Sequence, residues 1–262
     1  MKLKFLLIIL FVSFNCNAKY MFGTITFKDG RVQEGFIKSF MEKDIIDLNL
    51  SSKIEKKFNM DDETIKFKLT ENGESISYKI TDIKEVRFDY TDGTRAIYVP
   101  LSIKTFNKKG EIIDLKMILW LPLVKRGKIN LYGFQYFVRH KGVMGTIHHS
   151  RFYFQNQNDE FAILPYEKTT IFNRKANNRI QTAFYHYLFS SCPEFYESNT
   201  ERFRKVIYND FTMEEKKERF RSEAQHYNYY QNSNNYRTID NALKIAYNDI
   251  SIFMDEFIES CN

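Results

Sequence analysis

Residues 65–80 of the chain read IKFKLTENGESISYKI. Apolar and polar residues alternate on both sides of Asn72-Gly73, which is the pattern of two half-buried β-strands joined by a tight turn. A two-residue type I′ turn needs positive φ at both central positions, and Asn-Gly tolerates this best. Such a turn fixes the register of the hairpin. It predicts three pairs on one buried face: Leu69 with Ile76, Phe67 with Tyr78, and Ile65 with Ile80.

Two Asp-Gly dipeptides predict further hairpins of the same kind. Asp92-Gly93 would pair Phe88 with Ile97 and Val86 with Val99, and Asp29-Gly30 would pair Phe27 with Val32. Other apolar stretches predict strands at residues 102–106, 112–119, 129–134, 135–138 and 161–164. Many short strands separated by tight turns predict an antiparallel β-meander, curled or closed into a barrel-like sheet.

The glycines divide the chain into two parts. All 10 lie between Gly23 and Gly145, and none occurs in the 117 residues that follow. Since glycine supplies positive φ in tight turns and weakens helices, a turn-rich β region should precede a helical region. We therefore predict an α+β fold with a signal peptide at residues 1–18, an antiparallel β region at 19–170, and a helical region at 171–262 packed on it.

Apolar residues in the second part recur at the spacing of amphipathic helices. One stripe consists of Ile180, Ala183, Phe184, Tyr187 and Leu188, and another of Ile239, Leu243, Ala246, Ile250, Phe253 and Phe257. We interpret both as faces that pack on the protein's own core. Pro193 suits the first position of a helix. Two pairs, Ser198 with Glu201 and Thr212 with Glu215, have the spacing of a capping box.

The N-terminal residues predict export. Lys2 and Lys4 precede a mainly apolar run at residues 5–14, and small residues then allow cleavage after Ala18. As a helix this run spans about 15 Å, half of a bilayer core, so a permanent anchor is not expected. Acylation of Cys16 is a second interpretation. Because no later stretch is apolar enough to span a membrane, we expect a periplasmic or secreted protein.

Composition and motifs exclude several classes of protein. With 43% hydrophobic and 27% charged residues, the chain is neither disordered nor a multi-span membrane protein. A net charge of +6 permits attraction to anionic surfaces without a specific signal for nucleic acid. No dinucleotide fingerprint, phosphate loop, nucleophile elbow or metal-ligand spacing occurs. We predict no cofactor and no metal, and the sequence identifies no catalytic residue.

Two cysteines remain after the predicted cleavage. Cys192 and Cys261 each end an apolar helical stripe, and an exported protein is in a compartment where disulfides form. We therefore expect a bridge between them. Two buried free thiols are one alternative. Another is a nucleophilic Cys192 with His186 as its base.

A tyrosine-rich stretch, HYNYYQNSNNY at residues 226–236, has no apolar periodicity. Tyr227, Tyr229, Tyr230 and Tyr236 are candidates for stacking on sugar rings, with the neighbouring amides as hydrogen-bonding partners for hydroxyls. A polar loop between two helices is the simpler interpretation.

Several short motifs follow one another along the chain: Gly23-Thr24-Ile25, Gly35-Phe36-Ile37, Gly127-Lys128-Ile129-Asn130-Leu131-Tyr132, Tyr136-Phe137-Val138, Tyr185 to Leu188, Cys192-Pro193 and Tyr208-Asn209. In this order they resemble a group of uncharacterised exported proteins of Gram-negative bacteria. Members often have Asp before the Cys-Pro pair, where this chain has Ser191. The resemblance implies a β region, a helical tail and a location in the cell envelope, and it implies no activity.

We predict a non-enzymatic binding or interaction module of the cell envelope, whose partner is an unknown protein or glycan. The alternative is a hydrolase of envelope or extracellular polymers, with carboxylates brought together by the fold. A further alternative is glycan binding through the tyrosine-rich stretch. A pocket with convergent acids or histidines of shifted pKa would favour an enzyme. A shallow aromatic patch or an unpaired sheet edge would favour a binding module.

Overall fold

The computed structural model describes residues 20–40, 45–47, 58–91, 93–139, 146–165, 174–208, 210–218, 256–257 and 259–261. Strands occupy the chain up to Ile163, and helices follow from Arg174. In order the elements are β1 (Tyr20–Phe27), β2 (Val32–Lys38), β3 (Ile45–Asp47), β4 (Thr64–Lys68), β5 (Ile76–Lys79), η1 (Ile80–Asp82), β6 (Ile83–Asp89), β7 (Arg95–Phe106), β8 (Ile112–Lys125), β9 (Ile129–Arg139), β10 (Thr146–Asn156), β11 (Phe161–Ile163), α3 (Arg174–Phe189), α4 (Pro193–Ser198) and α5 (Thr200–Tyr208). The predicted signal peptide, the boundary at residue 170 and nearly all of the apolar stripe at 239–257 lie outside the described residues.

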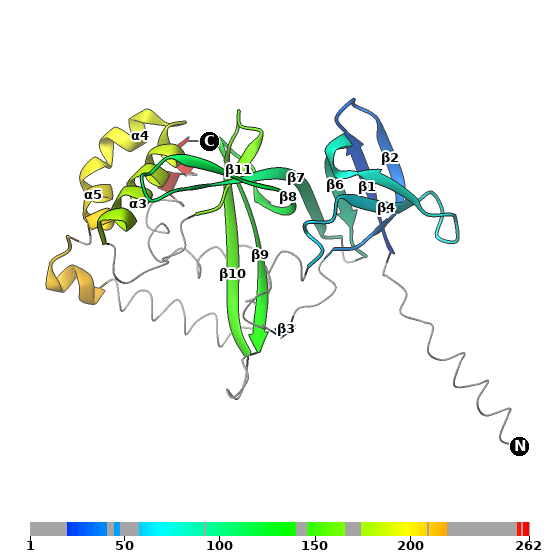
Figure 1. Cartoon of the computed structure of the whole chain (residues 1–262), viewed down its shortest axis with the longest axis horizontal. Coiled ribbons are helices and arrows are strands. Elements are labelled where there is room, and N and C mark those ends of the chain that lie inside the picture. Colours follow the sequence, from blue (N-terminus) through cyan, green and yellow to red (C-terminus); the bar gives the residue numbers. More distant parts are fainter. Residues whose placement is uncertain are drawn as a thin grey trace, which may run out of the picture.

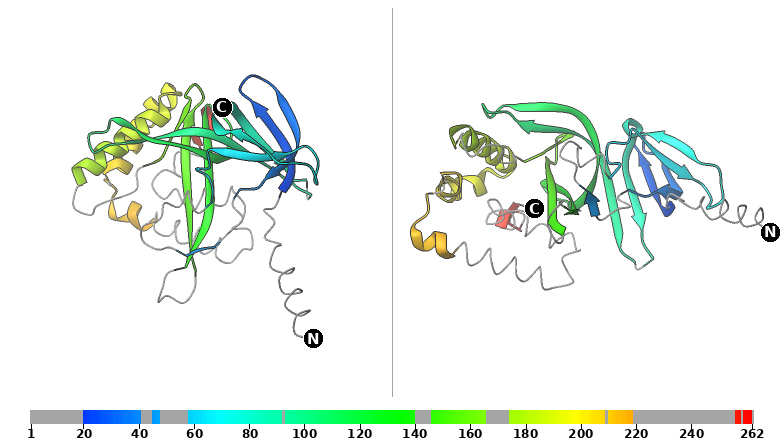
Figure 2. Two further views of the ribbon diagram at one scale, coloured as in Figure 1. Left: turned by 45° about the vertical axis from the view of Figure 1, so that its right-hand side comes forward. Right: turned by 60° about the horizontal axis from the view of Figure 1, so that its bottom comes forward.

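All eleven strands of the described residues form one continuous sheet, and the long strand β7 joins its two parts, a barrel and an N-terminal part that we call the N-terminal sheet (Figure 1; Figure 2). Residues Arg95 to Tyr98 of β7 pair with β6, which begins the order β6-β1-β2-β4-β5. Its residues Ser102 to Lys104 pair in parallel with β11 and so close β7, β8, β9, β10 and β11 into a barrel. Pro100, which has no N–H, lies between the two segments, where β7 pairs with neither β6 nor β11. The predicted barrel-like sheet is confirmed, with the difference that β11–β7 and β3–β9 are parallel pairs.

Alternation along the barrel strands sends side chains into two separate cores. All five strands contribute to one core, which therefore fills the inside of the barrel, with residues such as Leu101, Leu119 and Tyr153. The opposite face of β9, β10 and β11 packs against the helices. There, the ring centroids of Phe154 and Phe184 lie 5.2 Å apart. Each fully buried side chain of this size contributes roughly 1.5–3 kcal/mol, so this contact holds α3 against the barrel.

The N-terminal sheet buries one face in a third core. Trp120 of β8 lies in this core, fully buried. Its indole Nε1–H donates a hydrogen bond to the carbonyl of Asp62 (2.9 Å), and its backbone N–H donates to the carbonyl of Met60 (2.8 Å). The segment that leads into β4 is thereby tied to a barrel strand, which joins the N-terminal sheet to the barrel at a second place besides β7.

In three hairpins the last residue of the loop is a glycine with positive φ: Gly30 (89°), Gly93 (82°) and Gly110 (83°). Each of these glycines donates its N–H to the carbonyl three residues earlier, which is the geometry of a three-residue loop, a type I turn followed by a left-handed residue. The predicted two-residue turns at Asp29-Gly30 and Asp92-Gly93 are therefore wrong. The additional residue shifts the register by one. The pairs formed are Thr26 with Val32, Phe88 with Ala96, and Val86 with Tyr98.

The hairpin at residues 65–80 forms, with a longer loop than predicted. It pairs Ile65 with Tyr78 and Phe67 with Ile76, two residues away from the predicted register. Gly73 donates its N–H to the carbonyl of Thr70 (2.9 Å), so it is the fourth residue of a four-residue turn that begins at Thr70. The predicted turn had Gly73 as its third residue. Because a shift of two preserves the face, Ile65 and Phe67 are buried as predicted. The prediction is wrong for Leu69, which lies beyond the strand and is 71% exposed, and for Ile76, which is 49% exposed.

The helix predicted from the first apolar stripe is confirmed. Ile180, Phe184 and Leu188 of α3 are each at most 4% exposed and face the barrel. Pro193 is the first residue of α4, as expected for a residue that has no N–H to satisfy. Of the second stripe, Phe257 lies among the described residues and is buried beside Phe189 and Phe195.

One of the two predicted capping boxes forms. Thr212 donates its N–H to Glu215 Oε2 (2.7 Å), and Glu215 donates its N–H to Thr212 Oγ1 (3.2 Å). The prediction at Ser198 is wrong. Its hydroxyl donates instead to the carbonyl of Glu194 (2.7 Å), because Ser198 is the last residue of α4 and lies before the next helix begins.

Candidate functional site

The tip of the β7–β8 hairpin lies next to α3 (Figure 1). A groove of about 510 Å³ lies between α3, this hairpin tip and the end of α5. We call it the basic groove. Its lining residues are Lys109, Gly110, Lys175, Asn178, Arg179, Thr182, Ala183, His186 and Tyr208.

Helix α3 supplies one wall of the basic groove. Its lining residues recur at i, i+3, i+4, i+7, i+8 and i+11 from Lys175, so they form one face of the helix. The adjacent face carries the apolar residues that are buried against the barrel, such as Phe184. Packing of the apolar face therefore fixes the direction in which Lys175, Arg179 and His186 project.

The hairpin tip supplies the opposite wall. A Cβ atom on Gly110 would lie 3.3 Å from Ala183 Cβ, so the absence of a side chain lets the tip approach α3 closely. Asn107 Oδ1 accepts hydrogen bonds from the backbone N–H groups of Lys109 (2.8 Å) and Glu111 (3.1 Å). Asn107 also donates its amide to Glu111 Oε2 (2.8 Å). These bonds fix the turn that carries Lys109 into the groove.

The charge of the basic groove is positive. Its lining residues include three permanent cations and no carboxylate. None of the ion pairs formed among the described residues involves Lys109, Lys175 or Arg179. Helix α3 has no acidic residue in its first turn, so the positive end of its dipole adds to the charge of Lys175. A concave site with unpaired cations attracts anions.

His186 lies at the end of the groove beside α4. Its Nε2 and the hydroxyl of Tyr196 are 3.1 Å apart, and the two ring centroids are separated by 4.9 Å. Burial raises the pKa of Tyr196. The tyrosine therefore stays neutral and hydrogen-bonds the imidazole, which keeps His186 directed along the groove wall.

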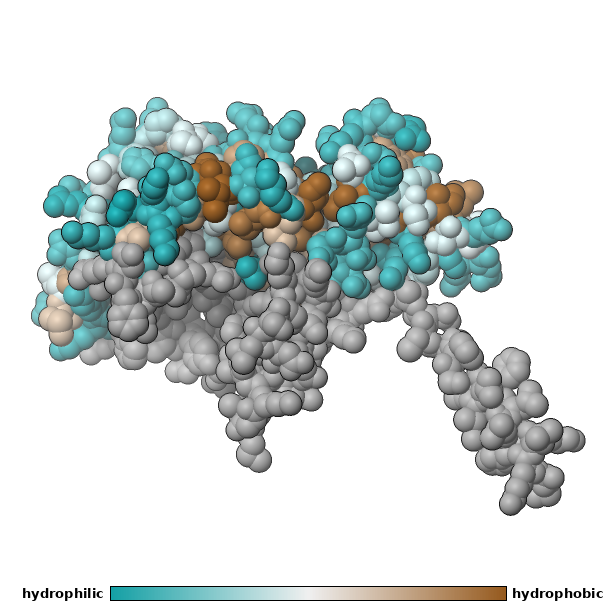
Figure 3. Space-filling model, viewed as in Figure 1, coloured by the Kyte–Doolittle hydropathy of each residue, from teal (hydrophilic) through white to brown (hydrophobic). Residues whose placement is uncertain are grey.

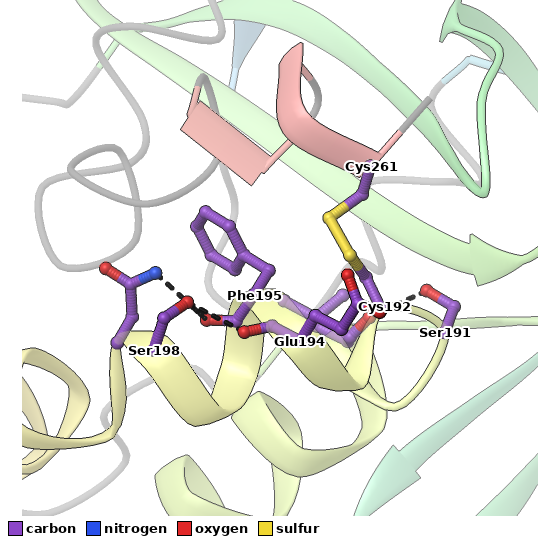
Figure 4. Close-up of a disulfide and its surroundings, with 8 residues drawn as sticks. Ser191, Cys192, Glu194, Phe195, Ser198 and Cys261 are labelled. Atoms are coloured by element: carbon purple, nitrogen blue, oxygen red, sulfur yellow. Dashed lines mark hydrogen bonds between the residues drawn. A yellow bond between two sulfur atoms is a disulfide. The ribbon is translucent and has the colours of Figure 1, made fainter.

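A disulfide closes the helical region (Figure 4). The Sγ atoms of Cys192 and Cys261 lie 2.08 Å apart, and the Cα atoms 6.0 Å apart. The expected bridge therefore has its partners within bonding distance, and the sulfur of Cys192 is not available as a nucleophile for His186. Nearby, the guanidinium of Arg202 donates two hydrogen bonds to the carboxylate of Glu256 (2.7 and 3.1 Å), which holds the same C-terminal segment to α5.

A polar network lies between the barrel and α3. The hydroxyl of Tyr187 donates to Asp159 Oδ2 (2.9 Å) and accepts a hydrogen bond from the N–H of Asn156 (3.2 Å). Burial, reinforced by the hydrogen bond and charge of Asp159, raises the pKa of Tyr187 far above its usual range, despite the opposing hydrogen bond from Asn156. Together these bonds set the distance between α3 and the strand that supports it.

The carboxyl groups with shifted pKa values do not converge. Burial raises the pKa of Asp62, against the opposing charges of Lys38 and Lys66. Hydrogen bonds to neighbouring donors lower the pKa values of Asp29, Asp114, Glu215 and Glu256. None of these acids lines the basic groove. Among the described residues, no group of three or more His, Cys, Asp or Glu side chains is arranged to hold a metal ion.

Of the two features of this region, the cysteine pair and the cations of the basic groove, the sequence predicted the cysteine pair. It identified Cys192 and Cys261, which the fold brings together. Tyr227, Tyr229, Tyr230 and Tyr236 lie outside the described residues. The cations of the basic groove were missed, although Lys175 and Arg179 are spaced four residues apart with no acid in the first helical turn. That pattern is the signal in the sequence that could have indicated them.

Neither family models nor curated proteins match the sequence significantly, and no solved structure matches the fold. In the part of the chain that the structure describes, no helix has the length and apolar character needed to cross a membrane.

Proposed function

We propose that the chain is an exported, non-enzymatic binding module of the cell envelope, and that its ligand carries negative charge. The observation that carries this proposal is the convergence of Lys109, Lys175 and Arg179 on one groove without a carboxylate among its lining residues. Hydrogen bonds between such cations and an anion are among the stronger polar contacts, each contributing about 1.5–3 kcal/mol. The predicted leader and the resemblance to exported proteins support the location.

The chemistry of the basic groove favours binding over hydrolysis. Hydrolases of polymers generally use a carboxylate or a histidine that activates water. The lining residues offer cations, an amide, hydroxyls and His186, whose Nε2 is hydrogen-bonded to Tyr196. An envelope protein or glycan with phosphate, sulfate or carboxylate groups is the kind of partner that this set of donors fits.

The proposal is tested with anions of known structure. Calorimetric titration of the protein with dextran sulfate, with neutral dextran and with inorganic pyrophosphate separates charge recognition from sugar recognition. We expect binding of the anions only, with an affinity that falls as salt is added. The triple variant K109Q/K175Q/R179Q should lose up to about a thousandfold in affinity, since each lost charge-assisted hydrogen bond is worth about a factor of ten.

A matched control removes three exposed lysines that do not line the groove. The variant K28Q/K84Q/K125Q lowers the net charge by the same amount, so its affinity should stay close to that of the wild type. Equal losses in the two variants, or equal binding of neutral dextran, would overturn the proposal. Release of reducing ends or phosphate during the titration would instead establish the hydrolase alternative. Glycan binding through Tyr229 and Tyr230 stays a prediction, tested by replacing both with Ala.

A further inference from the structure

The N-terminal sheet has a second basic surface, on the side opposite its core. Strands β1, β2, β4 and β5 bury alternate residues such as Ile37, Ile65 and Phe67, so the residues between them point to the other face. We call this surface the lysine–aromatic face. It consists of Tyr20, Phe22, Phe36, Lys38, Lys66, Lys68 and Lys79.

The strand pairing places these residues side by side. Tyr20 pairs with Lys38, Phe22 with Phe36, Phe36 with Lys68, and Thr64 with Lys79. The rings of Phe22 and Phe36 meet edge to face at 5.8 Å. The Lys68 ammonium lies 4.5 Å from the centroid of the Tyr20 ring. Phe22 remains 48% exposed, which is unusual for a phenylalanine in the middle of a strand.

The lysines of this face are not neutralised by ion pairs within the part of the chain that the structure describes. Carboxylates also border the face, among them Asp89 of β6, which is ion-paired with Arg87 and Arg95. Glu34 lies two residues from Phe36 on β2, and Asp62 lies near Lys38 and Lys66. The strand order places Lys38, Lys68, Lys66 and Lys79 over β2, β4 and β5, and the exposed ring of Phe22 lies beside this group of cations on β1.

We infer that the lysine–aromatic face docks on the surface of a membrane that contains anionic lipids. Lysines near such a surface are attracted to lipid phosphates, and aromatic rings are favoured at the level of the headgroups. In this arrangement Phe22 enters the headgroup region, while Lys38, Lys66 and Lys79 contact phosphates beside it. The inference concerns a different surface from the basic groove and does not depend on it.

The order of residues along the chain supports a lipid surface as the occupant. The apolar run at residues 5–14 ends six residues before Tyr20, a distance of at most about 20 Å in an extended chain. Until the predicted leader is cleaved, a run inserted in a membrane therefore keeps the face within reach of the membrane surface. A single-stranded nucleic acid would need successive open rings for its bases. Here the Tyr20 ring lies beneath Lys68 and Phe36 is half-buried, which leaves Phe22 as the exposed ring of this face.

Vesicle co-sedimentation of the full chain tests the inference. Vesicles of phosphatidylcholine alone are compared with vesicles that also contain phosphatidylglycerol. We expect binding to the anionic vesicles, and a loss of about fivefold per lysine removed, hence about a hundredfold in K38Q/K66Q/K79Q at low salt. K38R/K66R/K79R keeps the charge and should bind as the wild type does. K28Q/K84Q/K125Q is the matched control and should also bind normally.

Fluorescence tests the position of the aromatic residue. The chain has one tryptophan, Trp120, which is fully buried. The indole introduced by F22W should shift its emission to the blue on anionic vesicles and be quenched by brominated lipids. M213W places an indole at a site that is 70% exposed in the helical region, and its emission should not change.

Three results would overturn the inference. The first is equal binding by the wild type and K38Q/K66Q/K79Q, which would mean that the apolar run alone attaches the chain. The second is equal binding to the two kinds of vesicle. The third is binding to soluble dextran sulfate that is lost in K38Q/K66Q/K79Q, without binding to vesicles, since the occupant would then be a soluble polyanion. Normal vesicle binding by K109Q/K175Q/R179Q separates this inference from the proposed function.

Discussion

Removal of the Cys192–Cys261 bridge should destabilise the protein measurably. The bonded residues are 69 positions apart in the sequence. In the chain-entropy model, a loop of this length restricts the unfolded chain enough to stabilise the fold by about 4 kcal/mol at 25 °C. Because 1 kcal/mol corresponds to about 2–4 °C in a chain of this size, the variant C192A/C261A should melt about 10 °C below the wild type.

The structure also shows what the bridge holds in place. Phe257, four residues before Cys261, is buried between Phe189 and Phe195, with ring centroids 4.9 and 5.4 Å away. With the bridge removed, this ring and the Arg202–Glu256 ion pair would hold the C-terminal segment. Exposed ion pairs contribute little, at most about 1 kcal/mol. Amide hydrogens of this segment should therefore exchange faster in the variant than in the wild type.

The measurement is unfolding in guanidinium chloride, followed by far-ultraviolet circular dichroism with and without reductant. Reductant should lower the midpoint of the wild type and leave that of C192A/C261A unchanged. Mass spectrometry after alkylation without reduction should find Cys192 and Cys261 unlabelled. Labelling of both, or a wild-type midpoint that is the same in reductant, would refute the reasoning.

Three further changes test the packing, the polar network and the helix cap. Gly133→Ala would place a Cβ atom within 2.3 Å of the aromatic ring of Phe152 on β10, so a loss of about 1–3 kcal/mol in chemical denaturation is expected from overpacking. Tyr187→Phe removes the hydroxyl bonded to Asp159 and should cost about 1–3 kcal/mol, since buried partners lose their bonds. The pKa of the same hydroxyl is raised in the folded state. Its contribution to the free energy of unfolding is therefore complete below the unfolded pKa near 10 and is lost as the pH rises further. Melting temperatures of the wild type and the variant, measured as a function of pH, would show this difference. Thr212→Ala removes the acceptor for the Glu215 N–H and should lower the stability of that helix start by about 1 kcal/mol, seen as faster amide exchange confined to residues 213–218.

The alternation of apolar residues predicted the fold class because one face of each strand is buried. It did not predict the turn geometry. Lys28-Asp29-Gly30 forms a three-residue loop in which Gly30 has positive φ, and the Asp-Gly pair alone does not distinguish this from a two-residue turn. Strand β10 was missed because its first half contains the polar residues His148 to Arg151, which interrupt the apolar alternation.

The groove and the closure of the barrel depend on contacts between distant residues. Lys109 and Arg179 are 70 positions apart, and they line one groove because Gly110 lets the hairpin tip approach α3. The parallel pairing of Ala162 with Ile103 joins strands whose separation in the sequence leaves no local signal. The two capping-box patterns illustrate the same limit, since Ser198 has the right spacing but is the last residue of a preceding helix.

The sequence also did not predict that apolar residues of β8 are exposed, because their exposure depends on the local irregularity of this strand. Ile112, Ile113 and Ile118 are 37–43% exposed. Figure 3 shows hydrophobic residues along the middle of one side of the molecule, between hydrophilic regions over the helices and over the N-terminal sheet. Between Ile113 and Ile118, Lys116 has a positive φ of 56°, and Asp114 Oδ1 accepts the hydrogen bond of its N–H. A regular strand would not expose these side chains in this way, so the sequence pattern did not indicate them.

The continuity of β7 has a mechanical consequence. A single strand carries hydrogen bonds to β6 at one end and to β11 at the other, with no connecting linker. The N-terminal sheet and the barrel therefore cannot rotate relative to each other about β7 unless hydrogen bonds between strands break. A load applied to the N-terminal sheet is transmitted to the barrel as a rigid displacement, and the two parts should lose their structure cooperatively when either is pulled apart.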